Sequence, residues 1–221
     1  MIYVVPTSDP VRGRHLRDQA ALLAQRAKRG TVAASVSELV SHLPARKIYI
    51  AADRADLEAP AGVVSELLAD HLVHALGAAG LAQLEQVTLH ASYGAFLPDC
   101  ADLSRLIDSP AGRFYSALQQ RAGRDLKMKA NIGAVYCLPG GANRILKKEF
   151  GASEADRALT EIAAIADEAR REPAWREFIA HYLYDKGEGR VYFLNDAVNP
   201  VASAGRLESY NTQGWVVEGS A

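Results

Sequence analysis

Cysteine, long apolar runs and an excess of either charge are all scarce in this sequence. The 221 residues include only two cysteines, Cys100 and Cys137, too few for a disulfide framework or a cysteine-rich zinc site. A formal net charge of -1 gives the chain no overall field that favours nucleic acid or an acidic membrane as partner. No apolar stretch approaches the roughly 20 residues that span a bilayer, and the start "MIYVVPTSDP" lacks the basic region of a secretory signal. We therefore expect no membrane span, and a location in the cytoplasm or secretion without a classical signal peptide.

The residues that are present favour one α/β domain. Because 49% of them are hydrophobic, the chain can bury one sizeable core. Short β-branched runs alternate with segments of helical period, which is typical of a mainly parallel sheet flanked by helices. The predicted fold is a three-layer α/β sandwich. Its expected strands cover 2–5, 31–36, 47–52, 86–91 and 190–196, with a bent or double strand over 126–137; its expected helices cover 15–30, 64–76, 111–121 and 152–171.

The alternation of predicted strands and helices changes near residue 150. We predict an α/β core over 1–150 and a C-terminal helical and strand extension over 151–221, which packs on the core so that the whole is a single domain. Ser153 and Asp156 have the S-x-x-D spacing of a helix start, and Pro173 ends that helix or begins the next. The tail is compatible with edge strands, a partner-binding arm or a cover over the sheet.

The stretch "QVTLHASYGAF", residues 86–96, leads from a predicted buried strand into a serine between small residues. Reactive and ligand-binding groups of open α/β sheets gather beyond the carboxyl ends of strands, where Ser92 and Asp53 both fall. If the strands that precede them are neighbours, the two side chains face each other. Ser92 is then a nucleophile, the successor of a lost nucleophile, or a hydroxyl that satisfies backbone groups at a strand end.

The residues after this strand resemble a known family. Ala91, Ser92, one variable residue and Gly94 are similar to the Q-A-C-x-G signature of caspase-like cysteine peptidases. The order of elements over about 47–137, including "KIYIAAD" and "LKMKANIGAVYC", looks like the self-processing protease domains of bacterial toxins and effectors. The resemblance implies a caspase-like fold with the catalytic Cys at Ser92 and the catalytic His near Asp53. Ser92 then stands where the catalytic cysteine has been lost naturally or has been replaced by engineering. The resemblance implies a degenerate peptidase that binds a protein or a polyanion.

Two other hypotheses remain open. In the first, the chain is an active hydrolase that uses Ser92 as nucleophile with His90 as base, or uses Cys100 in the following loop as the nucleophile. In the second, it is an interaction module whose surface is formed by the C-terminal helices with Trp175, Phe178 and Trp215. Two further side chains are expected in the core, Cys137 at the end of a predicted buried strand and His71 on an apolar helical stripe. No metal site is predicted.

Basic residues gather over 113–148, where Asp125 is the only acid. Lys127 and Lys129 alternate along a predicted strand, so their ammonium groups share one face. This pattern predicts either a solvated face or an anion-binding site. The resemblance implies an inositol polyphosphate as ligand, because the similar toxin domains bind inositol hexakisphosphate on a basic surface near this part of the fold. The predicted anion-binding residues are Arg121, Arg124, Lys127, Lys129, Arg144, Lys147 and Lys148.

Overall fold

The computed structural model describes residues 1–7, 10–26, 32–33, 38, 45–52, 54–58, 63–138, 142–201 and 207–217. The strands are β1 (Ile2–Val4), β2 (Val32–Ala33), β3 (Lys47–Ala51), β4 (Gln86–His90), β5 (Lys127–Asn131), β6 (Val135–Cys137), β7 (Asn143–Ile145), β8 (Arg190–Leu194) and β9 (Ala197–Pro200). The helices are α1 (Pro10–Arg26), α3 (Arg54–Leu57), α4 (Val63–Gln83), η1 (Leu103–Asp108), α5 (Pro110–Ala122), α6 (Ala152–Ala163), α7 (Glu168–Tyr182) and η2 (Leu207–Tyr210).

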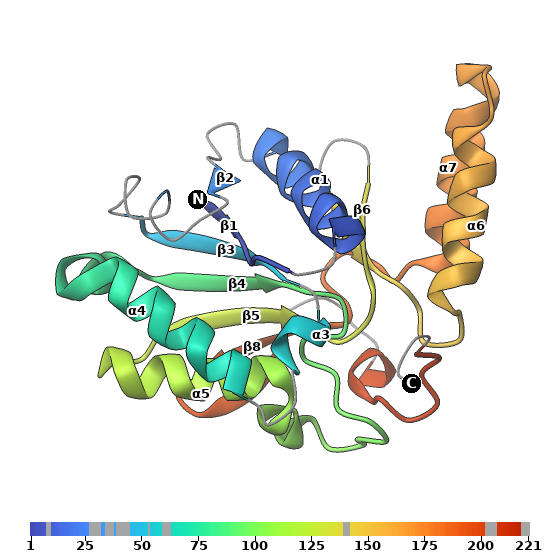
Figure 1. Cartoon of the computed structure of the whole chain (residues 1–221). Helices are drawn as coiled ribbons and strands as arrows, with labels where there is room; N and C mark the ends of the chain where they lie inside the picture. The colour runs from blue at the N-terminus through green and yellow to red at the C-terminus, as the bar shows by residue number, and fades with distance from the viewer. Residues whose placement is uncertain are drawn as a thin grey trace.

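A seven-stranded sheet in the order β2-β1-β3-β4-β5-β8-β9 forms the centre of the molecule (Figure 1). β2, β1, β3, β4 and β5 run parallel, whereas β8 pairs antiparallel with β5 and β9 pairs antiparallel with β8. The predicted α/β fold with a mainly parallel central sheet is therefore confirmed. The predicted C-terminal extension supplies two strands of this sheet. No described helix is both long enough and apolar enough to cross a membrane.

Alternating side chains of the strands pack against different helices. Ile2, Val4 and Ala51 form one buried cluster with the apolar side of α1. Ile48 and Ile50 point to the opposite face and join the larger cluster that includes α4 and α5. Figure 1 shows α1 on one side of the sheet and α4 with α5 on the other, consistent with a three-layer sandwich. These two faces differ sharply further along the sheet.

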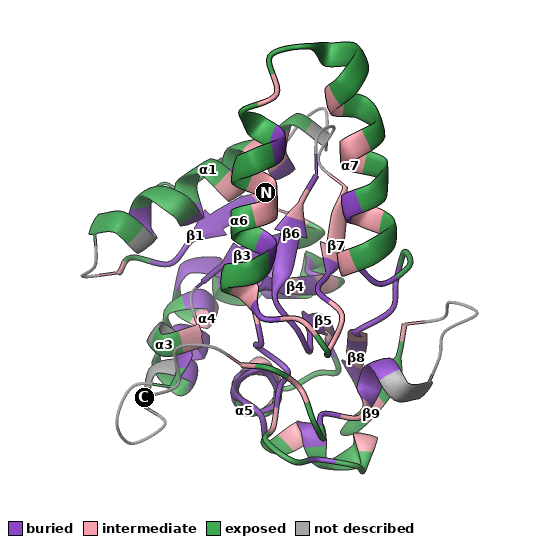
Figure 2. Cartoon of the chain, turned by 90° about the vertical axis from the view of Figure 1, so that its right-hand side faces the viewer, coloured by how far each residue is buried: buried purple, intermediate pink, exposed green. Residues whose placement is uncertain are grey.

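The face that carries α1 becomes polar across β4, β5 and β8. Strand pairing places Thr88 opposite Tyr49, Lys129 opposite Thr88, and Tyr192 opposite Lys129, and all four side chains are half-buried. On the other face, every apolar side chain of these strands is inaccessible: Val87, Leu89, Met128, Ala130, Val191 and Phe193 are each 0% exposed. Figure 2 shows this buried interior of the sheet against the more exposed helices. We call the half-buried row of Thr88, Lys127, Lys129 and Tyr192 the polar sheet face.

The predicted bent or double strand over 126–137 consists of two strands in different sheets. β5 belongs to the central sheet, whereas β6 leaves it and pairs antiparallel with β7 as a separate hairpin. Gly133 lies in the connection between the two strands. Its role is close packing, because a Cβ atom there would lie 2.2 Å from Cζ3 of Trp215 and 2.8 Å from Cγ2 of Ile145. Glycine therefore lets the C-terminal segment and the hairpin approach the same point.

The predicted helix over 152–171 is divided into α6 and α7, which stand side by side beyond the carboxyl ends of the strands (Figure 1). Asp167 causes the division, because its carboxylate accepts the Ala169 N–H at 2.9 Å and caps a new helix. α6 begins after Gly151 without a side-chain cap, so the predicted S-x-x-D start is wrong. Pro173 lies inside α7 rather than at a helix boundary.

The described C-terminal segment, 207–217, covers the loop that follows β4. The Thr212 hydroxyl accepts the Cys100 N–H at 2.8 Å and donates to the Leu97 carbonyl. Trp215 donates its indole N–H to the Asn211 carbonyl at 2.6 Å and packs its ring against Phe96. The C-terminal extension therefore contributes an edge strand, β9, and a segment, 207–217, that covers the loop after β4.

Gly133→Ala is expected to destabilise the fold by about 1–3 kcal/mol, since the added methyl group overpacks a site that Trp215 and Ile145 already fill. Urea denaturation followed by tryptophan fluorescence measures the change. The matched control is Gly13→Ala in α1, where a Cβ atom would lie 3.4 Å from Cγ2 of Thr7, and which should keep or raise stability. Equal stabilities of the Gly133 variant and the original chain would contradict this packing.

Candidate functional site

The carboxyl edge of the sheet brings together the segments that the sequence singled out. β3 and β4 are neighbours, with Ala51 opposite His90, and the Ala52 N–H donates to the His90 carbonyl at 3.3 Å. The expected juxtaposition of the two strand ends is therefore present. Asp53, the predicted partner of Ser92, lies outside the described residues.

Ser92 serves as an anchor for the hairpin. Its half-buried hydroxyl oxygen accepts the Val135 N–H at 3.1 Å, which ties the start of β6 to the end of β4. The next residue, Tyr93, has a φ of 56°, a strained value for an aromatic residue, and donates its N–H to the Gly133 carbonyl at 3.1 Å. Among the described residues, no imidazole forms a hydrogen bond with Ser92. The base that a serine nucleophile requires is therefore not in place there.

His90 points instead into a cluster made by three strands. Its Nε2 lies 3.7 Å from the Cys137 Sγ, and its Nδ1 lies 3.4 Å from the Asn143 Nδ2. Cys137 and Asn143 are directly paired across β6 and β7, so both side chains lie on the same face of the hairpin. His90 is 3% exposed, whereas Cys137 is half-buried. The expectation that Cys137 is a core residue is therefore wrong.

Burial sets the charge state of this cluster. Burial, followed by smaller electrostatic effects of Arg190 and His15, lowers the pKa of His90 to about 4. Burial also raises the pKa of the Cys137 thiol to about 11, although the charge of Arg190 opposes the increase. Both groups are consequently neutral near pH 7.

Asn143 connects the cluster to the edge of the main sheet. Its backbone carbonyl accepts a hydrogen bond from the guanidinium of Arg190 in β8. Its side-chain Oδ1 is buried and has no hydrogen-bond partner within the described ranges. An unpaired buried carbonyl oxygen costs free energy. The Asn143 amide, which contacts His90 through Nδ2, therefore has an acceptor that is not used.

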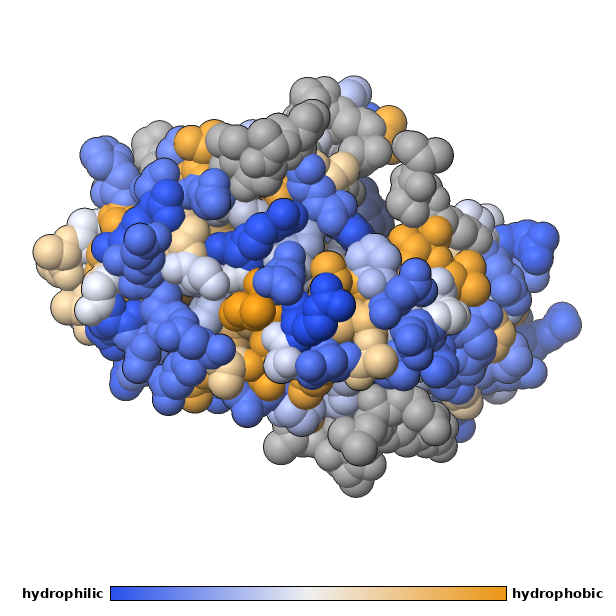
Figure 3. Space-filling model, turned by 90° about the horizontal axis from the view of Figure 1, so that it is seen from below, coloured by the Kyte–Doolittle hydropathy of each residue, from blue (hydrophilic) through white to orange (hydrophobic). Residues whose placement is uncertain are grey.

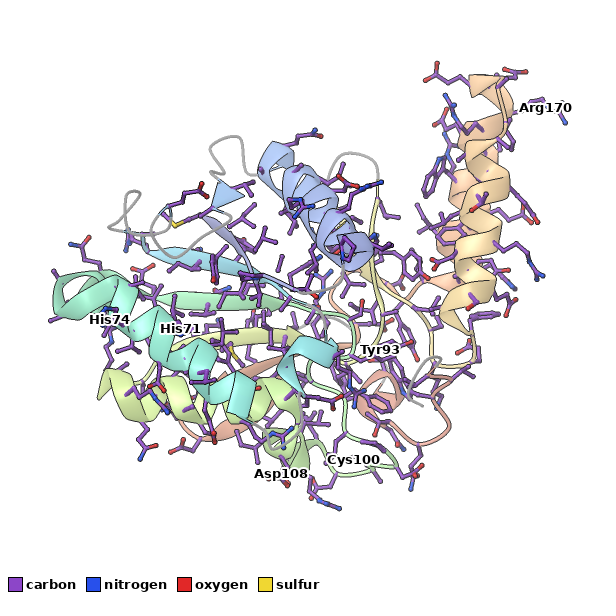
Figure 4. All side chains as sticks on the ribbon, in the orientation of Figure 1. His71, His74, Tyr93, Cys100, Asp108 and Arg170 are labelled. Atoms are coloured by element: carbon purple, nitrogen blue, oxygen red, sulfur yellow. The ribbon has the colours of Figure 1, made fainter. Side chains whose placement is uncertain are left out.

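Cys100 does not have the accessibility expected of a reactive thiol. It is 2% exposed, and its thiol donates to the Asp102 carbonyl at 3.0 Å. Its backbone is held by Thr212 of the C-terminal cover. Figure 4 shows Cys100 in the loop beyond the sheet. The structure thus reverses the expected burial of the two cysteines.

The predicted anion-binding residues are divided among several places. Arg121 forms an ion pair with Asp70, and Arg124 donates to the Leu81 carbonyl at 3.0 Å and the Ala82 carbonyl at 2.9 Å near the end of α4. Lys147 donates to the last carbonyls of α7 at 2.8 Å. Arg144 belongs to β7, and Lys148 follows it along the chain. Arg121, Arg124 and Lys147 therefore have side-chain partners other than a site shared with the lysines of β5.

Lys127 and Lys129 do lie together on the polar sheet face. The ammonium of Lys127 is 3.9 Å from the centre of the Tyr192 ring, and that of Lys129 is 5.8 Å from it. The ring therefore sits beside two positive charges. This pair is the part of the predicted anion site that the structure keeps together.

The histidines of α4 lie on its exposed side. His71 and His74 are both exposed, and Figure 4 shows them on the outer side of the helix. The prediction that His71 lies in the core is wrong, because the buried stripe of α4 runs through Leu68, Leu72, Ala75 and Leu76. Within the described ranges, no group of three His, Cys, Asp or Glu side chains could hold a metal ion.

The aromatic residues of the C-terminal helices mainly serve internal packing. Phe178 is 3% exposed and contacts Tyr136, and Trp215 contacts Tyr184. Trp175 lines a cavity of about 520 Å³ between α7 and the hairpin. Figure 3 shows the molecule from below, where the visible surface is mainly hydrophilic and its apolar residues form small separate patches. This face offers no broad apolar surface to a partner.

The sequence did contain a signal for the missed cluster. Cys137 and Asn143 flank "LPGGA", whose proline and glycines are typical of a turn. A hairpin around that turn places residues of equal distance from its centre on one face. The position of His90 beneath that face depends on tertiary packing and has no sequence signal.

A neutral buried His90 predicts a specific loss of stability in acid. Its folded pKa of about 4 lies below the unfolded value of 6.5, so its contribution is complete above pH 6.5 and is lost as the pH falls toward 4. The free energy of unfolding should fall by about 3 kcal/mol more for the original chain than for His90→Gln over this range. Urea denaturation at several pH values measures it, with the exposed His71→Gln as control. Parallel pH profiles for the chain and His90→Gln would contradict the burial of a neutral imidazole.

In comparisons with known proteins, no protein-family model and no curated protein matched the chain. The function must therefore be argued from the side chains at the carboxyl edge and on the polar sheet face.

Proposed function

We propose that this chain is a degenerate, peptidase-related α/β domain that acts by binding a small polyanion on its polar sheet face. The observation that carries the binding part is the placement of the Lys127 and Lys129 ammonium groups over the same Tyr192 ring. The proposed relationship to peptidases rests on the sequence resemblance around Ser92. The domains that this region resembles are the self-processing protease domains of bacterial toxins and effectors.

The state of Ser92 supports the loss of the original catalytic pair. A serine hydroxyl needs an adjacent base to become a nucleophile, whereas this hydroxyl accepts a backbone N–H from Val135. His90, on the same strand, makes its contacts with Cys137 and Asn143. The position that resembles a catalytic cysteine is thus used to hold the hairpin in place.

The electrostatics of the polar sheet face support anion binding. Lys127 and Lys129 are alternate residues of β5, so their side chains emerge about 7 Å apart on one face. No ion pair with a described carboxylate engages Lys127, and the Tyr192 ring restricts its position. Thr88, directly opposite Lys129, adds a hydroxyl that can donate to an anion. A phosphate group matches these donors in charge and size.

An inositol polyphosphate is the ligand that the resemblance implies. The two ammonium groups and one hydroxyl of the polar sheet face fit one or two phosphate groups of such a molecule. Arg121, Arg124 and Lys147 contact Asp70 and helix carbonyls, so they are not gathered around the same point. The proposed ligand class is therefore a compact phosphorylated molecule.

Binding is tested by isothermal titration of the full chain with inositol hexakisphosphate and, separately, with inorganic phosphate. Lys127→Ala together with Lys129→Ala should weaken binding by about tenfold or more, and added salt should weaken it for the original chain. The matched control is Arg113→Ala, which removes an exposed charge from α5 on the opposite side of the sheet. Equal weakening by both substitutions would show non-specific attraction, and no binding of either anion would refute the proposal.

A further inference from the structure

The cluster around His90 contains the three kinds of side chain that nucleophilic acyl transfer requires. Cys137 supplies a half-buried thiol, and His90 places Nε2 within 3.7 Å of its sulfur. Asn143 supplies an amide 3.4 Å from the other ring nitrogen. Each residue comes from a different strand, so the arrangement is made by the packing of the hairpin on β4.

The unpaired oxygen of Asn143 determines how the amide can serve this cluster. Oδ1 is buried without a partner in the described part of the chain, while Nδ2 faces Nδ1 of His90. The two ends of an amide have nearly the same shape, so a half-turn of the side chain exchanges them. Oδ1 then accepts a hydrogen bond from the Nδ1–H group, and the buried oxygen is satisfied. That bond leaves the lone pair of Nε2 directed at the thiol.

We propose that Cys137, His90 and Asn143 form a thiol–imidazole–amide centre that accepts acyl groups from esters and thioesters. Cys137 is the nucleophile, His90 is the general base, and Asn143 is the positioning residue that selects the tautomer of His90. The inference goes beyond the proposed anion binding and does not depend on it. It also places the reactive thiol at a position other than the one that resembles a peptidase cysteine.

The reaction proceeds in two balanced steps. The Cys137 proton moves to Nε2 while sulfur attacks the acyl carbon, and the bond to the leaving group breaks as His90 returns the proton to the departing alcohol or thiol. Water then attacks the resulting thioester with His90 as base. This second step releases a carboxylic acid and restores the thiol. No metal or redox partner is needed.

The charges around the cluster define the class of substrate. His15 of α1 and Arg190 of β8 are the charged or titratable groups that act on His90, and Arg190 also acts on Cys137. Arg190 favours negative charge on sulfur or on an acyl oxygen. Because burial keeps the thiol and imidazole neutral, proton transfer accompanies attack instead of preceding it. A good leaving group is then required, which favours esters and thioesters over amides.

The pH dependence of acylation distinguishes this centre from an inert buried thiol. Without a base, a thiol with a pKa of about 11 is ionised in about one molecule in ten thousand at pH 7. Its rate of acylation then rises tenfold per pH unit, because only the thiolate reacts. A thiol assisted by neutral His90 reacts at a constant rate wherever His90 is neutral and the thiol is protonated. The expected plateau extends from about pH 5.5 to pH 9.5.

The full chain is treated with 4-nitrophenyl acetate at several pH values, and peptide mass spectrometry measures acetylation at each residue. We expect acetyl-Cys137 with a pH-independent rate over the plateau. His90→Gln should lower that rate by about 100-fold or more and remove the plateau, whereas the exposed His71→Gln should leave it unchanged. Asn143→Ala should slow acylation, and Asn143→Asp should retain it with a plateau that begins at a higher pH, because the carboxylate favours protonated His90.

The profile of the original chain decides the proposal even if a variant fails to fold. A rate at Cys137 that rises tenfold per unit up to pH 9.5 would overturn it. Absence of both acetyl-Cys137 and 4-nitrophenol release from the folded chain, with acetylation of the same residue in urea, would overturn it as well. An unaltered profile in a folded His90→Gln variant would exclude His90 as the base.

Discussion

The attachment of the β6–β7 hairpin to the end of β4 is the constraint on which the carboxyl edge depends. Two hydrogen bonds make it, from the Val135 N–H to the Ser92 hydroxyl and from the Tyr93 N–H to the Gly133 carbonyl, each 3.1 Å long. A further bond, from the Ala95 N–H to the Asn131 carbonyl at 2.8 Å, ties the loop after β4 to the end of β5, from which the hairpin continues. Together they place one face of the hairpin over His90. The strained φ of Tyr93 is held by the same contacts.

This attachment separates two roles along one face of the sheet. At the carboxyl edge the hairpin contacts His90, whose burial keeps the imidazole neutral beside the neutral thiol of Cys137. Two residues earlier, Thr88 lies on the same face without such a cover and is half-buried beside Lys129. The proposed anion binding therefore uses the open part of the face, and the proposed acyl transfer uses its covered end. They are about 7 Å apart along β4, close enough for one molecule to reach both.

Local patterns predicted most elements of the central sheet but failed where long-range packing competes. β3 and β4 were recognisable because β-branched and apolar residues cluster between turn signals. The helix over 152–171 was predicted too long, because helical periodicity continues across Asp167 and conceals its capping role. His71 was assigned to the wrong side of α4, because the apolar pattern of this helix extends to Leu67, which is 45% exposed. A single-sequence pattern locates a helix better than it locates its buried face.

By itself, the sequence determined the α/β class, the mainly parallel order of elements and the shared facing of Lys127 and Lys129, since these follow from local periodicity. Only the tertiary structure decided which residues meet. It gave Ser92 a backbone partner and gave Arg121, Arg124 and Lys147 separate partners. It also brought Cys137 and Asn143 from the hairpin to His90. The physical reason is that a hairpin's docking position depends on contacts between distant segments, and no local spacing records those contacts.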